Sequence, residues 1–121
     1  MATTAEIGRA GEQVATEYLR QHGFLICEQN WRNGRYEIDI IATKWDTIHF
    51  VEVKTRRADG LTPPEAAITA AKFRALKHAA SLYLALHTID LEPYFDLCAV
   101  EYRMGEPPVI RYIEDAMEST W

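Results

Sequence analysis

Two apolar, β-branched runs separated by only a short connection constrain this chain more than any other feature. The first run extends from Tyr36 to Thr43 and the second from Thr47 to Thr55. The polar and aromatic segment between them, Lys44-Trp45-Asp46, has the length of a hairpin connection. The two runs therefore predict an antiparallel β-hairpin, and the rest of the chain must fold around it.

Charged residues interrupt both runs at positions where the neighbours are suited to burial. Asp39 stands among isoleucines, and Glu52 and Lys54 alternate with valines. Buried charges are costly unless they are paired or bound to a metal. Residues two apart on a strand share a face, so Glu52 and Lys54 point the same way, and the hairpin brings Asp39 beside them. Two converging carboxylates suit a hard cation such as Mg²⁺, and a nearby ammonium can orient water or neutralise charge on a phosphate.

A second interpretation of the same residues needs no metal. Glu37, Asp39, Glu52 and Lys54 could form the solvated face of the hairpin, with ion pairs across the strands. The E-x-K spacing alone does not separate the two interpretations. The apolar neighbours of these residues favour strands covered on both faces, and hence the metal site.

Helices are predicted on either side of the hairpin. The first is expected from Arg9 to His22, where apolar residues recur at helical spacing before Gly23. The second is expected from about Pro63 to about His87, because Thr62 can cap it and Pro63 suits its first turn.

Three further runs are predicted to be strands, and they are Phe24 to Trp31, Tyr94 to Arg103, and Val109 to Ile113. The order of elements is therefore α-β-β-β-α-β-β. Passage from the hairpin through the second helix to the next strand implies a parallel crossover. We expect an α/β fold in which a mixed β-sheet is flanked by helices.

Length and composition limit the number of domains and the classes of protein to which the chain can belong. With 121 residues, 48% of them hydrophobic, residues 1–121 are expected to form a single domain. The N-terminus has no basic region followed by an apolar stretch, and no segment has the apolar length that crosses a bilayer, so we expect a cytoplasmic protein without a membrane partner. Cys27 and Cys98 are far apart and outside any C-x-x-C pair. We interpret both as small buried residues rather than disulfide partners or zinc ligands.

The charge of the chain is negative overall but uneven. A formal net charge of −5 argues against a protein that coats nucleic acid non-specifically. Basic residues nevertheless dominate from Lys54 to Lys77, whereas acidic residues dominate from Asp90 onward. Such asymmetry allows one basic face on an acidic protein, although a charge run is more often a solvated surface than a binding site. The residues predicted to bind nucleic acid are Arg56, Arg57, Lys72, Arg74 and Lys77.

Several motifs together resemble one family. They are Gly11-Glu12, Asn30-Trp31-Arg32, Glu37-Ile38-Asp39-Ile40-Ile41-Ala42, Phe50-Val51-Glu52-Val53-Lys54-Thr55-Arg56, Phe95-Asp96 and Ile113-Glu114-Asp115-Ala116. In these motifs, and over nearly its whole length, the chain resembles the YraN-type family of small bacterial endonuclease-like proteins. It departs from the family pattern at Tyr36, where the family has glycine, and at Tyr94, where the family has arginine.

The resemblance implies a restriction-endonuclease-like fold of the PD-(D/E)XK type, similar to archaeal Holliday-junction resolvases. It implies that Asp39 and Glu52 are ligands of Mg²⁺ or Mn²⁺, that Lys54 is the catalytic lysine, and that Glu12 is a further catalytic acid from the first helix. The expected function is therefore a metal-dependent endonuclease acting on DNA, with branched DNA as one candidate substrate.

Two alternatives stay open at the level of the sequence. The chain could be a non-catalytic module that retains the nuclease fold and binds nucleic acid or a protein. Its substrate could also be RNA rather than DNA. Cutting both strands of a symmetric junction would favour a homodimer, but no interface is legible in the sequence.

Overall fold

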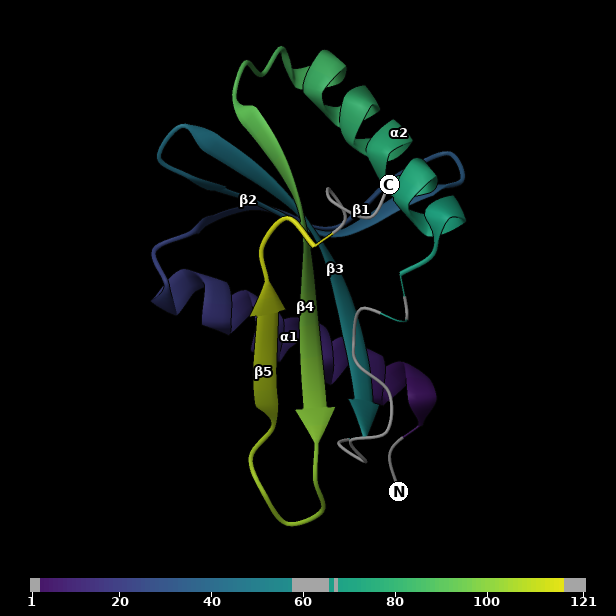
Figure 1. The fold of residues 1–121 in the computed structure, drawn as a ribbon, viewed down its shortest axis with the longest axis vertical. Coiled ribbons are helices and arrows are strands. Elements are labelled where there is room, and N and C mark those ends of the chain that lie inside the picture. The colour runs from purple at the N-terminus through teal and green to yellow at the C-terminus, as the bar shows by residue number, and fades with distance from the viewer. Residues whose placement is uncertain (1–2, 58–65, 67, 117–121) are drawn as a thin grey trace.

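The helices and strands occur in the predicted order α-β-β-β-α-β-β (Figure 1). A computed structural model describes residues 3–57, 66 and 68–116. The elements are α1 (Thr4–Gln21), β1 (Leu25–Asn33), β2 (Tyr36–Lys44), β3 (Thr47–Arg57), α2 (Ala70–His87), β4 (Glu92–Tyr102) and β5 (Val109–Ile113).

The strands form one mixed sheet in the order β1-β2-β3-β4-β5. Pairing is antiparallel except between β3 and β4, which are parallel from Thr47 beside Glu92 to Arg57 beside Tyr102. A parallel pair needs a crossover connection, and α2 lies within that connection. The predicted α/β class with a mixed sheet and flanking helices is confirmed.

The two helices cover opposite faces of the sheet. Leu76 and Tyr83 of α2 pack in one buried cluster with Phe50 of β3, whereas Leu19 of α1 packs in another with Val51. Phe50 and Val51 are adjacent on one strand and therefore point to opposite faces. In Figure 1, α1 passes behind β3 and β4, and α2 lies in front of the sheet. Both faces of the central strands are thus buried, as their apolar sequences predicted.

Capping residues set the beginnings of the helices. Thr3 caps α1, since its Oγ1 accepts the Glu6 N–H at 3.1 Å while its own N–H donates to Glu6 Oε1 at 3.1 Å. This capping box starts the helix earlier than the predicted Arg9. Neither helix in the described part of the chain is long and apolar enough to span a membrane.

The start of α2 corrects the prediction. Thr69 is the N-cap, its Oγ1 accepting the Lys72 N–H at 3.1 Å, so Ile68 and Thr69 are not helical. The predicted continuous helix from Pro63 is therefore wrong at these two residues, because a second threonine supplies the cap. The predicted cap Thr62 and start Pro63 lie outside the described residues.

The two cysteines differ in burial. Cys98 is buried in β4 as predicted, but Cys27 is exposed, and both are free. The pairing of β1 with β2 shifts between Ile26 and Glu28, which places Cys27 at a β-bulge. A bulge interrupts the alternation of buried and exposed residues, so the prediction of burial fails at Cys27.

Candidate active site

The predicted site residues gather where β2 leaves β3. Backbone pairing between the two strands begins at the hairpin turn and ends at Ile40 opposite Val51. Ile38 packs in the cluster under α2, whereas Ile40 packs in the cluster under α1. Residues two apart on a regular strand point to the same face. Ile38 and Ile40 point to opposite faces, so the regular alternation of β2 is broken at Asp39. In Figure 1, β2 lies in the upper half of the view, while β3 continues downward beside β4.

Where backbone pairing ends, the Asp39 side chain rather than the β2 backbone makes the next hydrogen bond to β3. Its Oδ2 accepts the N–H of Val53 at 2.8 Å. The carboxylate is thereby held at the edge of β3 beside the segment that carries Glu52 and Lys54. All three side chains are half-buried.

Burial and the charge of Glu52 disfavour the ionised form of Asp39. Burial, followed by the charge of Glu52, raises the pKa of Asp39 to about 7, and the Val53 N–H only partly offsets this. Burial also raises the pKa of Glu52, against the opposing influence of Lys72 and Lys54. Like charges close together in a half-buried place are the setting in which a cation is most stabilising.

Two ammonium groups act on Glu52. Lys72, in the first turn of α2, lowers the pKa of Glu52 more than Lys54 does. Lys54 was predicted from the E-x-K spacing on one strand. The stronger influence of Lys72 depends on how α2 lies over the sheet, and the two-residue period of a strand carries no signal for it.

Glu12 belongs to α1, which covers the face of the sheet opposite to α2, and it acts on the same two carboxylates. Its charge contributes to the raised pKa of both Asp39 and Glu52. The neighbouring Gly11 explains how, since a Cβ at Gly11 would lie 2.0 Å from Thr55 Oγ1. The absence of a side chain at Gly11 lets α1 approach β3 closely, and so brings Glu12 beside the carboxylates.

Glu37 is a further acid near the site. The sequence placed it only in the solvated-hairpin interpretation, yet it also raises the pKa of Asp39 and Glu52. Its carboxylate lies 3.3 Å from Arg32 Nη2, and both side chains are exposed. Glu37 therefore lies at the rim of the site, already paired with a cation.

The donor set fits a divalent cation held by two protein carboxylates. Among the described residues, no three His, Cys, Asp or Glu side chains form a group that could enclose a metal. Mg²⁺ commonly keeps several waters and binds through one or two carboxylates together with substrate phosphates. Asp39 and Glu52 supply such a pair, and a cation would relieve the repulsion between them.

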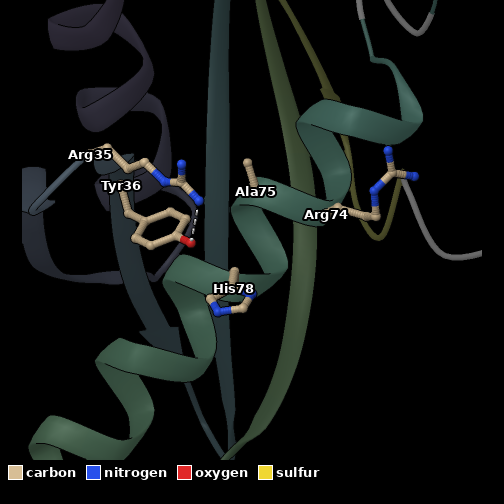
Figure 2. Close-up of a pocket in the computed structure, with 5 residues that line it drawn as sticks. All are labelled: Arg35, Tyr36, Arg74, Ala75 and His78. Atoms are coloured by element: carbon tan, nitrogen blue, oxygen red, sulfur yellow. Dashed lines mark hydrogen bonds between the residues drawn. The ribbon is translucent and has the colours of Figure 1, made fainter.

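The cations predicted to bind nucleic acid have different surroundings. Arg56 Nε and Nη2 donate to Glu101 Oε2 at 3.1 and 2.9 Å, so its charge is already engaged. Arg57 is exposed at the end of β3. Arg74 lines a surface pocket (Figure 2), and Lys77 Nζ lies 5.5 Å from the centre of the Phe73 ring. Contact with nucleic acid stays a prediction for each of them.

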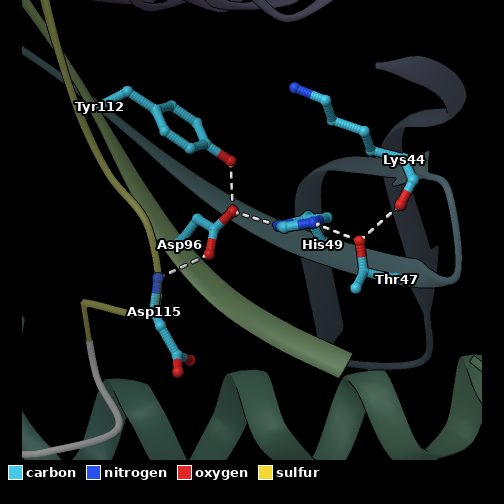
Figure 3. A network of polar contacts seen from close by, with 6 residues as sticks. All are labelled: Lys44, Thr47, His49, Asp96, Tyr112 and Asp115. Carbon is cyan, nitrogen blue, oxygen red and sulfur yellow. Dashed lines mark hydrogen bonds and ion pairs between the residues drawn. The ribbon is translucent and has the colours of Figure 1, made fainter. Parts of the chain in front are cut away.

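A buried polar network lies away from the carboxylates (Figure 3). Asp96 Oδ2 lies 2.6 Å from His49 Nδ1 and accepts from the Tyr112 hydroxyl, while Oδ1 accepts the Asp115 N–H at 2.8 Å. His49 Nε2 lies 2.9 Å from Thr47 Oγ1. No buried side-chain N or O atom in the described part of the chain lacks a partner. The network therefore joins β3, β4 and the segment after β5, and we assign it to stability rather than catalysis.

Most of this amino-acid sequence matches known proteins. Residues 11–100 match the family described as Uncharacterised protein family UPF0102. A UPF0102 protein of Bacteroides thetaiotaomicron is 42% identical over 100 residues, which cover 83% of each chain. A UPF0102 protein of Parabacteroides distasonis is 40% identical over 116 residues, 96% of this chain and 95% of its own. Another, of Geotalea uraniireducens, is 40% identical over 118 residues, 97% of this chain and 93% of its own.

Proposed function

This chain belongs to the protein family UPF0102, and from its site we propose that it is a metal-dependent endonuclease that hydrolyses phosphodiester bonds in DNA, branched DNA included. One observation carries the proposal. The half-buried carboxylates of Asp39 and Glu52 both have a raised pKa, the charge of Glu52 acts on Asp39, and Lys72 and Lys54 act on Glu52. A solvated hairpin face would leave such acids with ordinary pKa values.

Asp39 and Glu52 would hold Mg²⁺ or Mn²⁺. When bound, such a cation polarises a phosphate and makes a bound water more acidic. The hydrogen bond from Val53 to Asp39 fixes one of the two carboxylates before any cation arrives. This preorganisation lowers the cost of assembling the site.

The basic and acidic neighbours have distinct proposed roles. Lys54 orients the attacking water and stabilises charge that develops on the phosphate, and Lys72 adds a second cation from α2. Glu12 accepts a hydrogen bond from water at the site. Contacts to the phosphate backbone are expected from Arg57, Lys72, Arg74 and Lys77, and from Arg56 beside its pairing with Glu101.

A non-catalytic module is the second candidate. The net charge of −5 favours it, as does the lack of a three-ligand metal group among the described residues. Such a module would bind nucleic acid or a protein without cleaving anything.

A cleavage assay separates the two candidates. Labelled linear, flapped and four-way DNA would be incubated with Mg²⁺ or Mn²⁺ and analysed on denaturing gels. We expect metal-dependent cutting that Glu52→Gln reduces by about 10² to 10³, the usual effect of removing one charge-stabilising group. Glu106→Gln removes an exposed carboxylate between β4 and β5 and should cut as wild type does. Binding of these DNAs by wild type without any cutting would favour the non-catalytic module.

A further inference from the structure

A basic pocket of about 320 Å³ lies between α2 and the β1–β2 connection (Figure 2). It is lined by Arg35, Tyr36, Arg74, Ala75 and His78. None of these residues is acidic, and α2 itself contains no Asp or Glu. In a protein of net charge −5, this is a local reversal of sign.

A stack of side chains positions one of the two arginines. The Arg35 guanidinium carbon lies 5.3 Å from the centre of the Tyr36 ring, and Arg35 Nη2 donates to the Tyr36 hydroxyl at 3.4 Å. The Tyr36 ring stacks on His78, with centroids 5.3 Å apart and planes at 10°. Figure 2 shows the ring between the guanidinium and the imidazole. The stack orients an exposed guanidinium in advance, which reduces the entropy lost when it binds a ligand.

The second arginine lies across the pocket. In Figure 2, Arg74 extends away from Tyr36 on the far side of Ala75. Ala75, which Figure 2 shows between Tyr36 and Arg74, adds only a methyl group to the lining of the pocket. Planar guanidinium groups bind phosphate through paired N–H donors, so the pocket suits an anionic oxygen group of phosphate type.

The pocket adjoins the proposed active site. Tyr36 precedes Asp39 by three residues of β2, a distance of about 10 Å along a strand. Arg74 follows Lys72, which acts on Glu52, in the first turns of α2. Successive nucleotides of one strand rise by about 3.4 Å along duplex DNA, so one strand can reach both the pocket and the carboxylates within a few nucleotides.

We propose that this pocket is a second phosphate-binding subsite for the substrate strand. It would hold a backbone phosphate within a few nucleotides of the bond cleaved at Asp39 and Glu52, with Arg35 and Arg74 as its cations. The inference rests on the proposed nuclease function, because the reacting bond defines the strand that the pocket holds. It adds Arg35, Tyr36 and His78 to the residues that contact or position the substrate.

The salt dependence of DNA binding tests the subsite. Fluorescence anisotropy of labelled duplex DNA would be measured in EDTA, so that no cleavage occurs, over a series of salt concentrations. Each phosphate contact contributes about 0.9 to the slope of log affinity against log salt. We expect Arg35→Ala and Arg74→Ala each to weaken binding about tenfold at low salt, and the double variant, which loses the one phosphate contact of the pocket, to lower the slope by about 0.9. Arg103→Ala, which removes an exposed arginine in the connection between β4 and β5, should leave the slope unchanged.

The outcomes distinguish this inference from the proposed function. Cutting by wild type, together with an unchanged slope in the double variant, overturns the subsite and leaves the nuclease intact. A reduced slope in the double variant without any cutting by wild type supports a phosphate-binding pocket and contradicts the nuclease. Failure of wild type to bind DNA in EDTA at low salt overturns the subsite.

Discussion

Asp39 is held by two influences that act in opposite directions on its charge. The N–H of Val53 donates to Oδ2 and favours the carboxylate, whereas burial and the charge of Glu52 favour the neutral acid. The second influence is larger, because the pKa rises from 3.8 to about 7. The metal-free site is therefore partly protonated near neutral pH, and binding of a cation would displace that proton.

The raised pKa of Asp39 predicts how stability depends on pH. The folded protein binds this proton more tightly than the unfolded chain, so stability falls as pH rises from about 4 to about 7 and then levels off. Each pH unit corresponds to about 1.4 kcal/mol, which sets an upper bound of about 4 kcal/mol. Asp39→Asn keeps an acceptor for Val53 and removes the charge. The variant should therefore match wild type at pH 4 and exceed its stability at pH 8.

Urea unfolding at pH 4 and pH 8 in EDTA measures this difference. Asp46→Asn, at the exposed hairpin turn, serves as the control and should follow wild type at both pH values. A constant difference in unfolding free energy between wild type and Asp39→Asn across this range would contradict the raised pKa of Asp39.

At the scale of elements, the hairpin of β2 and β3 was predictable, but the point at which the two strands separate was not. Two apolar runs with a short connection predict paired strands, and the alternation of Glu52 and Lys54 places both on one face. The end of pairing at Ile40 and Val51 depends on Ile38 and Ile40 packing under different helices. Strand periodicity describes a single face and so carries no information about which helix will cover each segment.

Gly11 shows a related limit. A glycine within a helical pattern lowers the stability of the helix by up to about 1 kcal/mol relative to alanine. The fold uses it for close contact with Thr55, three residues beyond Glu52, the second candidate metal ligand. That role requires the packing of α1 on β3, which local sequence does not contain.

Gly11→Ala should therefore separate α1 from β3. The new Cβ would meet Thr55 Oγ1 at 2.0 Å and Thr55 Cβ at 3.2 Å, so the helix or the threonine must move. We expect a loss of about 1 to 3 kcal/mol in unfolding free energy, the usual cost of overpacking, and slower cleavage because Glu12 shifts. Chemical denaturation and the cleavage assay measure the two effects.

Two further variants identify the cause. Gly8→Ala, in the same helix, places its Cβ in open space and should stabilise the protein, since alanine favours helix. Adding Thr55→Ala to Gly11→Ala removes the nearest obstructing atom and should recover part of the stability. Equal effects of the alanines at positions 8 and 11 would show that contact with Thr55 is unimportant.

At the scale of the whole molecule, the site depends on both layers around the sheet. Glu12 belongs to α1 and Lys72 to α2, on opposite faces, yet both act on Glu52. They can do so because β2 no longer covers that edge of β3 beyond Ile40. The buried contact between His49 and Asp96 joins β3 to β4 within the same sheet.

Since the site is assembled only in the folded protein, a bound cation should stabilise the whole molecule. Asp39, Glu52 and Glu12 hold like charges together in the metal-free state, and the unfolded chain separates them. A cation that binds only the folded form adds about 2.7 kcal/mol of stability at 100 times its dissociation constant. Mn²⁺ or Mg²⁺ should therefore raise the melting temperature by several degrees, in proportion to the logarithm of concentration.

Thermal melts of three proteins with and without millimolar Mn²⁺ would test this linkage. Wild type should gain stability from the metal, and Asp39→Asn should gain none, because it has lost one of the two carboxylate ligands. Asp39→Asn in EDTA should nevertheless melt no lower than wild type, since the substitution also removes repulsion within the site. Glu106→Gln controls for non-specific binding of the cation to surface acids and should respond as wild type does. If the metal raises all three melting temperatures equally, the stabilisation comes from surface charge; a wild-type melt indifferent to millimolar Mn²⁺ would remove the ground for a metal at Asp39 and Glu52.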